Sequence, residues 1–202
     1  MKQSNWMAWA AAMSALLAVL ALVALDPIVA AATAGGAPDS LWSRGTALLD
    51  VITLKNVSNF LLGPVLLLAA ILLLVMPSMR DRFAWPLVYV GAVQALSTMI
   101  ADFSKPLFGR ARPFEAAADI WFTGANSFPS GHTAFYAGLF FPLIVLFPRW
   151  TALLVIPPLF VAASRVIEND HYVSDVAASL ALAAALAAAL AFLARRGDSR
   201  AR

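Results

Sequence analysis

Long apolar runs, separated by shorter polar segments, occupy most of this 202-residue chain. A helix that crosses a membrane needs about 20 mostly apolar residues, and runs near this length predict spans at about residues 6–32, 60–76, 85–101, 131–147, 150–163 and 172–194. Residues 40–59 mix apolar and polar positions, which predicts an amphipathic helix at the membrane interface after the first span. The pattern therefore predicts an all-α, polytopic membrane protein, in which a bundle of six transmembrane helices forms one membrane-embedded domain over residues 1–202.

The first apolar run also has features of a cleavable signal peptide. It follows a single lysine, Lys2, and ends near the small residues around Ala34, where cleavage would occur. Its length exceeds that of a typical signal-peptide core, which favours a retained first span. We therefore expect residues 1–34 to stay part of the bundle.

Composition narrows the classes of function. The chain is 62% hydrophobic and 12% charged, whereas soluble domains are about one quarter charged. It has no cysteine, so disulfides, thiolate metal sites and cysteine catalysis are excluded. It shows no Gly-rich phosphate loop and no nucleic-acid-binding motif, and its basic residues are scattered. We expect no nucleic-acid partner and infer no obligate protein partner.

The distribution of charge predicts the orientation in the membrane. Six spans place both termini on one side, which then holds eight basic residues and two acidic ones, against six basic and nine acidic residues on the other side. The positive-inside rule puts the termini in the cytoplasm. The loops at residues 102–129 and 164–171 then share the periplasmic face of an inner membrane, and both histidines of the chain, His132 and His171, lie on that face.

Three polar clusters fall at this face. The first is KPLFGRARP, the second is PSGH directly before the fourth span, and the third is SRVIENDHYVSD, so that together they contribute Lys105, Arg112, Pro113, Pro129, Ser130, Gly131, His132, Ser164, Arg165, His171 and Asp175.

Lys105, Arg112 and Arg165 are cations placed beside hydrocarbon. A charge in the bilayer centre costs about 2.5–3.5 kcal/mol on insertion scales. Three such charges at one membrane end are expected to converge on an anion, for which Arg offers a planar fork and Lys a point charge.

Each of these cations, taken alone, also fits a simpler interpretation. Its side chain would then reach the lipid head groups or pair with a nearby acid such as Asp102, Glu115 or Glu168. Arg110 falls between Lys105 and Arg112 but is not among the residues that the clusters contribute, and we expect it only to extend towards the head groups.

The PSGH cluster predicts a helix start. Proline suits the first turn, glycine permits close approach of the backbone, and the exposed N–H groups of a helix start favour an anion. Ser130 would add a hydroxyl donor to this site, or would serve only as an ordinary N-cap.

His171 and Asp175 are four residues apart at the start of the last span. On a helix this spacing brings the two side chains within reach, and a carboxylate on one ring nitrogen leaves the other free to attack or to accept a proton. A merely structural interfacial histidine remains an alternative.

A zinc site of His132, His171 and Asp175 is chemically possible, but the three neighbouring cations would repel a dication. We therefore predict no metal and no cofactor.

Together the clusters read K-x6-R-P, P-S-G-H and S-R-x5-H-x3-D, and this signature resembles that of the type 2 phosphatidic acid phosphatase superfamily. The resemblance implies that His171 is the nucleophile, that Asp175 orients it, and that His132 protonates the leaving oxygen and later activates water. It also implies a phosphate cradle, made of Lys105, Arg112, Arg165, Ser130, Gly131 and Ser164.

The resemblance implies an integral membrane lipid phosphatase that works through a phosphohistidine. By family analogy undecaprenyl pyrophosphate is the leading substrate, ahead of lipid A 1-phosphate, phosphatidylglycerophosphate and phosphatidic acid. A lipid phosphotransferase with the same site is one alternative, and a non-enzymatic carrier of anionic lipid is another. The apolar spans disfavour a vanadate-dependent peroxidase, which would share only the anion cradle.

Overall fold

The computed structural model describes residues 2–37, 39–115 and 119–200, and all the regular elements in these ranges are helical. Arg202, which contributes to the charge distribution above, lies outside them. The elements, in chain order, are α1 (Lys2–Leu20), η1 (Ala21–Leu25), α2 (Asp26–Ala32), α3 (Leu41–Ile52), α4 (Leu62–Leu74), α5 (Pro77–Met79), η2 (Arg80–Ala84), α6 (Trp85–Phe108), η3 (Pro113–Glu115), α7 (Gly131–Leu146), η4 (Pro148–Trp150), α8 (Thr151–Leu154), α9 (Ile156–Ile167) and α10 (Val173–Arg200).

Within the described ranges, four helical stretches are long and apolar enough to cross a membrane: Asn5–Ala32, Arg82–Glu115, Pro148–Ile167 and Val173–Ala194. Two shorter apolar helices, Leu62–Leu74 and Gly131–Leu146, occupy the positions of the predicted second and fourth spans. The predicted all-helical membrane architecture is therefore confirmed, whereas six as the number of spans stays a prediction.

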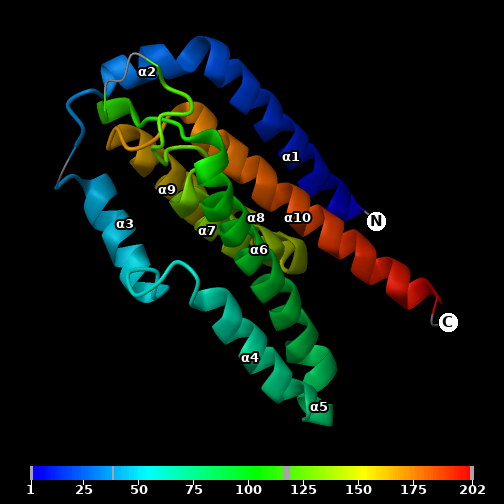
Figure 1. Cartoon of the computed structure of the whole chain (residues 1–202). Coiled ribbons are helices and arrows are strands. Elements are labelled where there is room, and N and C mark those ends of the chain that lie inside the picture. Colours follow the sequence, from blue (N-terminus) through cyan, green and yellow to red (C-terminus); the bar gives the residue numbers. More distant parts are fainter. Residues whose placement is uncertain (1, 38, 116–118, 201–202) are drawn as a thin grey trace.

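Helix α10 organises the bundle. Helix α1 packs along it, and α10 also packs against α6 and α7, while α4 lies on α6 and α3 on α9 (Figure 1). The labelled N and C ends lie at the same end of the bundle, and α2 meets the loops that follow α6 and α9 at the opposite end. The first apolar run thus packs along the last helix, and its retention stays a prediction.

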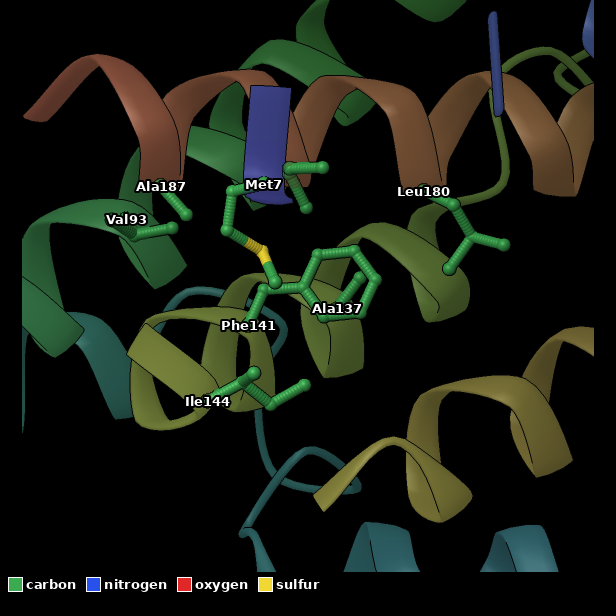
Figure 2. Close-up of a cluster of buried hydrophobic side chains, with 9 residues drawn as sticks. Met7, Val93, Ala137, Phe141, Ile144, Leu180 and Ala187 are labelled. Atoms are coloured by element: carbon green, nitrogen blue, oxygen red, sulfur yellow. The ribbon is translucent and has the colours of Figure 1, made fainter. Parts of the chain in front are cut away.

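Small side chains let these helices approach closely. The largest cluster of buried apolar residues joins α1, α6, α7 and α10 (Figure 2), and its members include Met7, Val93, Ala137, Phe141, Leu180, Ala183 and Ala187. A Cβ atom at Gly138 of α7 would lie 2.8 Å from the Cβ of Ser97 on α6. Close contact of this kind is typical of membrane helices. It fixes α6 relative to α7, and so positions the end of α6 beside the start of α7 at the polar end.

Prolines set the irregular turns in the helices. The π-helical turns η1 and η2 come immediately before Asp26-Pro27 and Trp85-Pro86. A proline has no N–H for the preceding turn and clashes with its carbonyl, which favours a wider turn. In the predicted fifth span, α8 ends before Pro157 and Pro158, and α9 begins at Ile156.

Two predicted boundaries near the polar end differ from the structure. The third helix was expected to end near residue 101, but α6 continues to Phe108, because Asp102 and Lys105 pair across one turn at 2.6 Å. The last helix begins at Val173. His171 therefore lies in the turn before the helix instead of on it.

Candidate active site

The three polar clusters meet at the end of the bundle opposite the termini. Lys105 is carried by the last turn of α6, and Arg112 follows in the next loop. The PSGH segment begins α7, with Ser130 as its N-cap. Arg165 is in the last turn of α9, and Asp175 is in the first turn of α10. Five separate segments thus supply the predicted residues.

Backbone contacts fix the second cluster to the third. The N–H of Ser130 donates to the carbonyl of Asp175 at 3.3 Å, and the hydroxyl of Ser179 donates to the carbonyl of Ser130 at 2.9 Å. The side chain of Ser130 accepts from the N–H of Thr133, as an N-cap does. The start of α7 is therefore held against the start of α10.

His171 is buried beside Asp175. Its Nδ1 lies 3.4 Å from Oδ2 of Asp175 and 3.5 Å from the hydroxyl of Ser127. The carbonyl of Arg165 accepts the backbone N–H of His171 at 3.1 Å, which fixes this turn to the end of α9. Burial lowers the pKa of His171, Asp175 opposes this shift, and Arg112 and Arg165 add to it, so the net shift is downward. The imidazole is therefore neutral at neutral pH.

Asp175 is the centre of the hydrogen-bond network. The N–H of Tyr172 donates to its carboxylate at 2.9 Å, so Asp175 closes the first turn of α10 in the manner of a capping box. The hydroxyl of Ser127 donates to the same oxygen at 2.5 Å, and Arg110 pairs with the other oxygen. A fully buried carboxylate with these partners is fixed in place and stays an acceptor for His171.

The prediction for Arg110 was wrong. Its side chain is fully buried, and its Nη2 lies 2.7 Å from Oδ2 of Asp26 while its Nη1 contacts Asp175. The guanidinium also lies 4.6 Å from the ring centre of Trp121 and 4.0 Å from that of Tyr172. Two carboxylates and two aromatic faces compensate for the loss of water, so this cation does not need to reach the head groups.

The three expected phosphate-binding cations each contact an acid. Lys105 pairs with Asp102 at 2.6 Å, Arg165 with Glu168 at 2.7 Å and Arg112 with Asp170 at 3.4 Å, and Arg165 also contacts Asp170. The simpler interpretation of these cations is thus partly correct. Arg112 and Arg165 nevertheless share the carboxylate of Asp170, so their donors converge on a single small anionic group.

Gly131 and Ser164 are two further residues of the predicted cradle, and the structure defines their neighbours. A Cβ atom at Gly131 would lie 2.6 Å from Oδ1 of Asp102 and 3.1 Å from Nζ of Lys105, so a larger residue there would shift the Asp102–Lys105 pair that lies against the start of α7. Ser164 is buried, donating to Glu168 at 2.7 Å and accepting from Thr46 at 2.8 Å. Its observed contacts support Glu168, which in turn pairs with Arg165.

His132 has a carboxylate partner outside the three clusters. Its Nε2 lies 3.2 Å from Oδ2 of Asp50 on α3. The charge of Arg165 acts on both His132 and His171, so both imidazoles lie near the same guanidinium. In the described part of the chain, no group of three His, Asp or Glu side chains is arranged to hold a metal ion.

Sequence reasoning missed four residues of this site: Asp26, Asp50, Arg110 and Ser127. Asp26 gave a usable signal, because an acid within an apolar run points to a buried partner. Asp50 lies on an amphipathic helix, where charge is ordinary, and Ser127 carries no distinguishing pattern. The position of Asp50 and Ser127 follows only from the packing.

Known proteins share sequence and fold with this chain. The family model of the PAP2 superfamily matches residues 84–197. Lipid A 1-phosphatases from Rhizobium johnstonii and Rhizobium etli are 31% identical over 109 residues and 32% identical over 106 residues. These alignments cover 50% and 48% of this chain and 45% and 46% of the two relatives, so the chain matches about half the length of each.

A solved structure shares the whole fold. The crystal structure of a transmembrane PAP2-type phosphatidylglycerolphosphate phosphatase from Bacillus subtilis superposes with a TM-score of 0.54, covers 100% of this chain and 98% of its own, and is 20% identical in sequence. The family match covers more than half of the chain and contains all three clusters. The chain therefore belongs to the PAP2 superfamily.

Proposed function

We propose that the chain is an integral membrane hydrolase that removes phosphate from a lipid through a phosphohistidine intermediate. The observation that carries this proposal is the buried His171–Asp175 pair, placed beside two arginines that share one anionic partner. Phosphoryl transfer depends mainly on positioning and on electrostatic stabilisation of the transferred group. This cluster supplies a nucleophile and fixed positive charge together.

In the first step, His171 attacks the phosphorus. Nδ1 faces Asp175, so Nε2 is the nitrogen that forms the P–N bond. The P–O bond to the lipid breaks, its electron pair goes to the lipid oxygen, and this oxygen takes a proton from His132. In the second step, water attacks the phosphorus and gives a proton to His132, the P–N bond breaks, and its electron pair returns to Nε2.

The phosphate oxygens would bind to Lys105, Arg112 and Arg165. Nε of Arg165 is buried without a hydrogen-bond partner among the described residues, so it has a donor to offer. Bidentate arginine contacts suit phosphate, and binding would replace the carboxylate of Asp170 with the substrate. The protein's own cations then neutralise the charge that develops on the transferred group.

The substrate we propose is a lipid phosphate in the outer leaflet of an inner membrane. The charge distribution favours the periplasmic face for the site, at the depth of lipid head groups. The two rhizobial relatives are lipid A 1-phosphatases, which raises lipid A 1-phosphate above undecaprenyl pyrophosphate as the first substrate to test. Phosphatidylglycerophosphate and phosphatidic acid complete the comparison set.

Phosphate release by purified protein in detergent micelles tests this function. We expect release from at least one of these four lipids, and loss of at least about 1000-fold in the His171→Ala variant, which should still bind lipid. Asp39→Asn is the control variant, because Asp39 is exposed and belongs to none of the three clusters. Full activity of His171→Ala would reject the proposal and favour a carrier. Phosphate that appears only on an added acceptor lipid would indicate a phosphotransferase instead.

A further inference from the structure

Each of the two imidazoles in the site has its own carboxylate, and only one of these belongs to the three sequence clusters. Asp175 serves His171, whereas Asp50 contacts His132 from α3 with a separation of 3.2 Å between Oδ2 and Nε2. Asp50 lies outside residues 84–197, the part of the chain that matches the family model. Its pairing with His132 is therefore a feature that the shared motifs do not contain.

Asp50 is held on its other side as well. The hydroxyl of Tyr136 donates to Oδ1 of Asp50 at 2.7 Å, and the hydroxyl of Thr53 lies 3.1 Å from that of Tyr136. Tyr136 is one turn after His132 on α7, so the same helix carries both groups that hold the carboxylate. A carboxylate fixed at both oxygens has one orientation, and it imposes one orientation on the imidazole.

Helix α3 is itself fixed against the helix that carries Arg165. Trp42 stacks on Phe160 of α9 with ring centres 5.0 Å apart, and Thr46 donates to Ser164 at 2.8 Å. Asp50 follows Thr46 by four residues, so it lies one turn further along the same helix. The packing of α3 against α9 thus fixes the position of Asp50.

The charges around His132 determine how the carboxylate of Asp50 acts on its protonation. The positive charges of Lys55 and Arg165 lie near the imidazole of His132, and both disfavour its protonation. Burial raises the pKa of Asp50, but hydrogen bonds from His132 and Tyr136 and the charges of His132 and Lys55 outweigh it, so the net shift is downward. Asp50 is therefore ionised at neutral pH, and it partly offsets burial and the two cations, which disfavour the protonated imidazole.

We propose that Asp50 is the positioning residue for the acid–base histidine, His132. An ionised carboxylate only accepts hydrogen bonds, so Nε2 of His132 must donate to it, and Nδ1 is left as the nitrogen that exchanges protons with the reacting groups. Nδ1–H gives its proton to the lipid oxygen as the P–O bond breaks, and Nδ1 later takes one proton from the attacking water. This inference rests on the proposed function and deepens it.

The test compares two leaving groups in the Asp50→Asn variant. A lipid alkoxide needs a proton to leave, whereas p-nitrophenolate leaves without one. We expect phosphohistidine formation from lipid phosphate to slow by about 100-fold, within the range of general acid catalysis. With p-nitrophenyl phosphate, the burst of nitrophenol should change by less than about threefold, followed by slower steady turnover because water activation still needs the aligned His132.

A purely structural role would give another result. If Asp50→Asn slows the formation step equally for both substrates, Asp50 does not assist proton donation and the inference fails, although the phosphatase function would stand. A wild-type protein inactive on both substrates would instead reject the proposed function. Asp39→Asn makes the same chemical change at an exposed carboxylate before α3 and should leave both formation rates unchanged.

Tyr136→Phe provides a second, milder variant. It removes the hydroxyl that holds Oδ1 of Asp50 but keeps the ring in the core. We expect a smaller loss with the same dependence on the leaving group. If Asp50→Asn does not fold, as judged by gel filtration in detergent, this variant carries the test alone, and an equal loss on both substrates would overturn the proposal.

Discussion

The carboxylate of Asp170 occupies the position between Arg112 and Arg165 at which two guanidinium groups converge. The same donors are those that the family resemblance assigns to phosphate. A carboxylate and a phosphate compete for such donors, because both accept paired hydrogen bonds from arginine. At the scale of single residues, Asp170 therefore neutralises these two guanidinium groups, and a phosphate bound to them would have to displace its carboxylate.

We predict that Asp170→Asn lowers the KM for lipid phosphate by about fivefold, as expected for one partly exposed ion pair, with kcat within about twofold. The amide keeps the shape of the side chain but competes less well for the two arginines. Steady-state phosphate release over a range of lipid mole fractions in mixed micelles measures both constants. A higher KM would show that Asp170 orients the arginines for binding instead of competing with the substrate.

The lowered pKa of His171 predicts the acid side of the pH profile. A base with a lowered pKa stays unprotonated at more acidic pH. The neutral imidazole of His171 is therefore still present at pH 6.5, the ordinary histidine pKa of about 6.5. It is lost only as the pH falls through the lower pKa that His171 has in the folded protein. Single-turnover formation of phosphohistidine, followed by rapid quench, should keep more than half of its plateau rate at pH 6.5. The lipid phosphate's own titration, measured by phosphorus NMR, must be subtracted. A midpoint above pH 6.5 would contradict the prediction.

At the scale of elements, Arg110 connects three helices that are distant in sequence. It follows α6, and its guanidinium contacts Asp26 at the start of α2 and Asp175 at the start of α10. Asp26 also accepts the backbone N–H of Ser174 at 3.0 Å. The first apolar run is thus tied, through Asp26 and Arg110, to the carboxylate that contacts His171.

Removing the charge of Arg110 should be costly for this reason. We predict that Arg110→Met destabilises the protein by about 3–5 kcal/mol, because it leaves two buried carboxylates without compensation. Unfolding in detergent, followed by circular dichroism, measures the loss. Arg44→Met is the matched control, since Arg44 is exposed on α3, and it should change stability by less than about 0.5 kcal/mol.

A double variant separates charge from packing at this position. Adding Asp26→Asn to Arg110→Met removes one of the two stranded carboxylates, so the combined loss should be smaller than the sum of the single losses. Strict additivity would indicate that Asp26 and Arg110 stabilise the bundle independently, which the 2.7 Å contact between them argues against.

At the scale of the molecule, the features that could be predicted from the sequence are those that depend on local patterns of residues. Apolar runs located the helices, and the spacing within three clusters identified residues that the fold brings to one end of the bundle. Prediction from the sequence failed where a residue's environment depends on distant partners. Arg110 is buried because Asp26, 84 residues away, compensates for its charge, and His132 is oriented by Asp50, which is 82 residues away. Helix ends were also misplaced where a local ion pair prolonged α6.

The position of the site at one end of the bundle makes the orientation in the membrane testable. Because the chain has no cysteine, one introduced cysteine is a specific label. We predict that a membrane-impermeant maleimide labels the Asp119→Cys variant in intact spheroplasts, since residue 119 is exposed near the site. It should not label the Ser78→Cys variant, because the short helix α5, which carries residue 78, belongs to the predicted cytoplasmic side. Permeabilised cells should label at both positions, which controls for accessibility. The reverse pattern would place the site in the cytoplasm and would make an outer-leaflet substrate untenable.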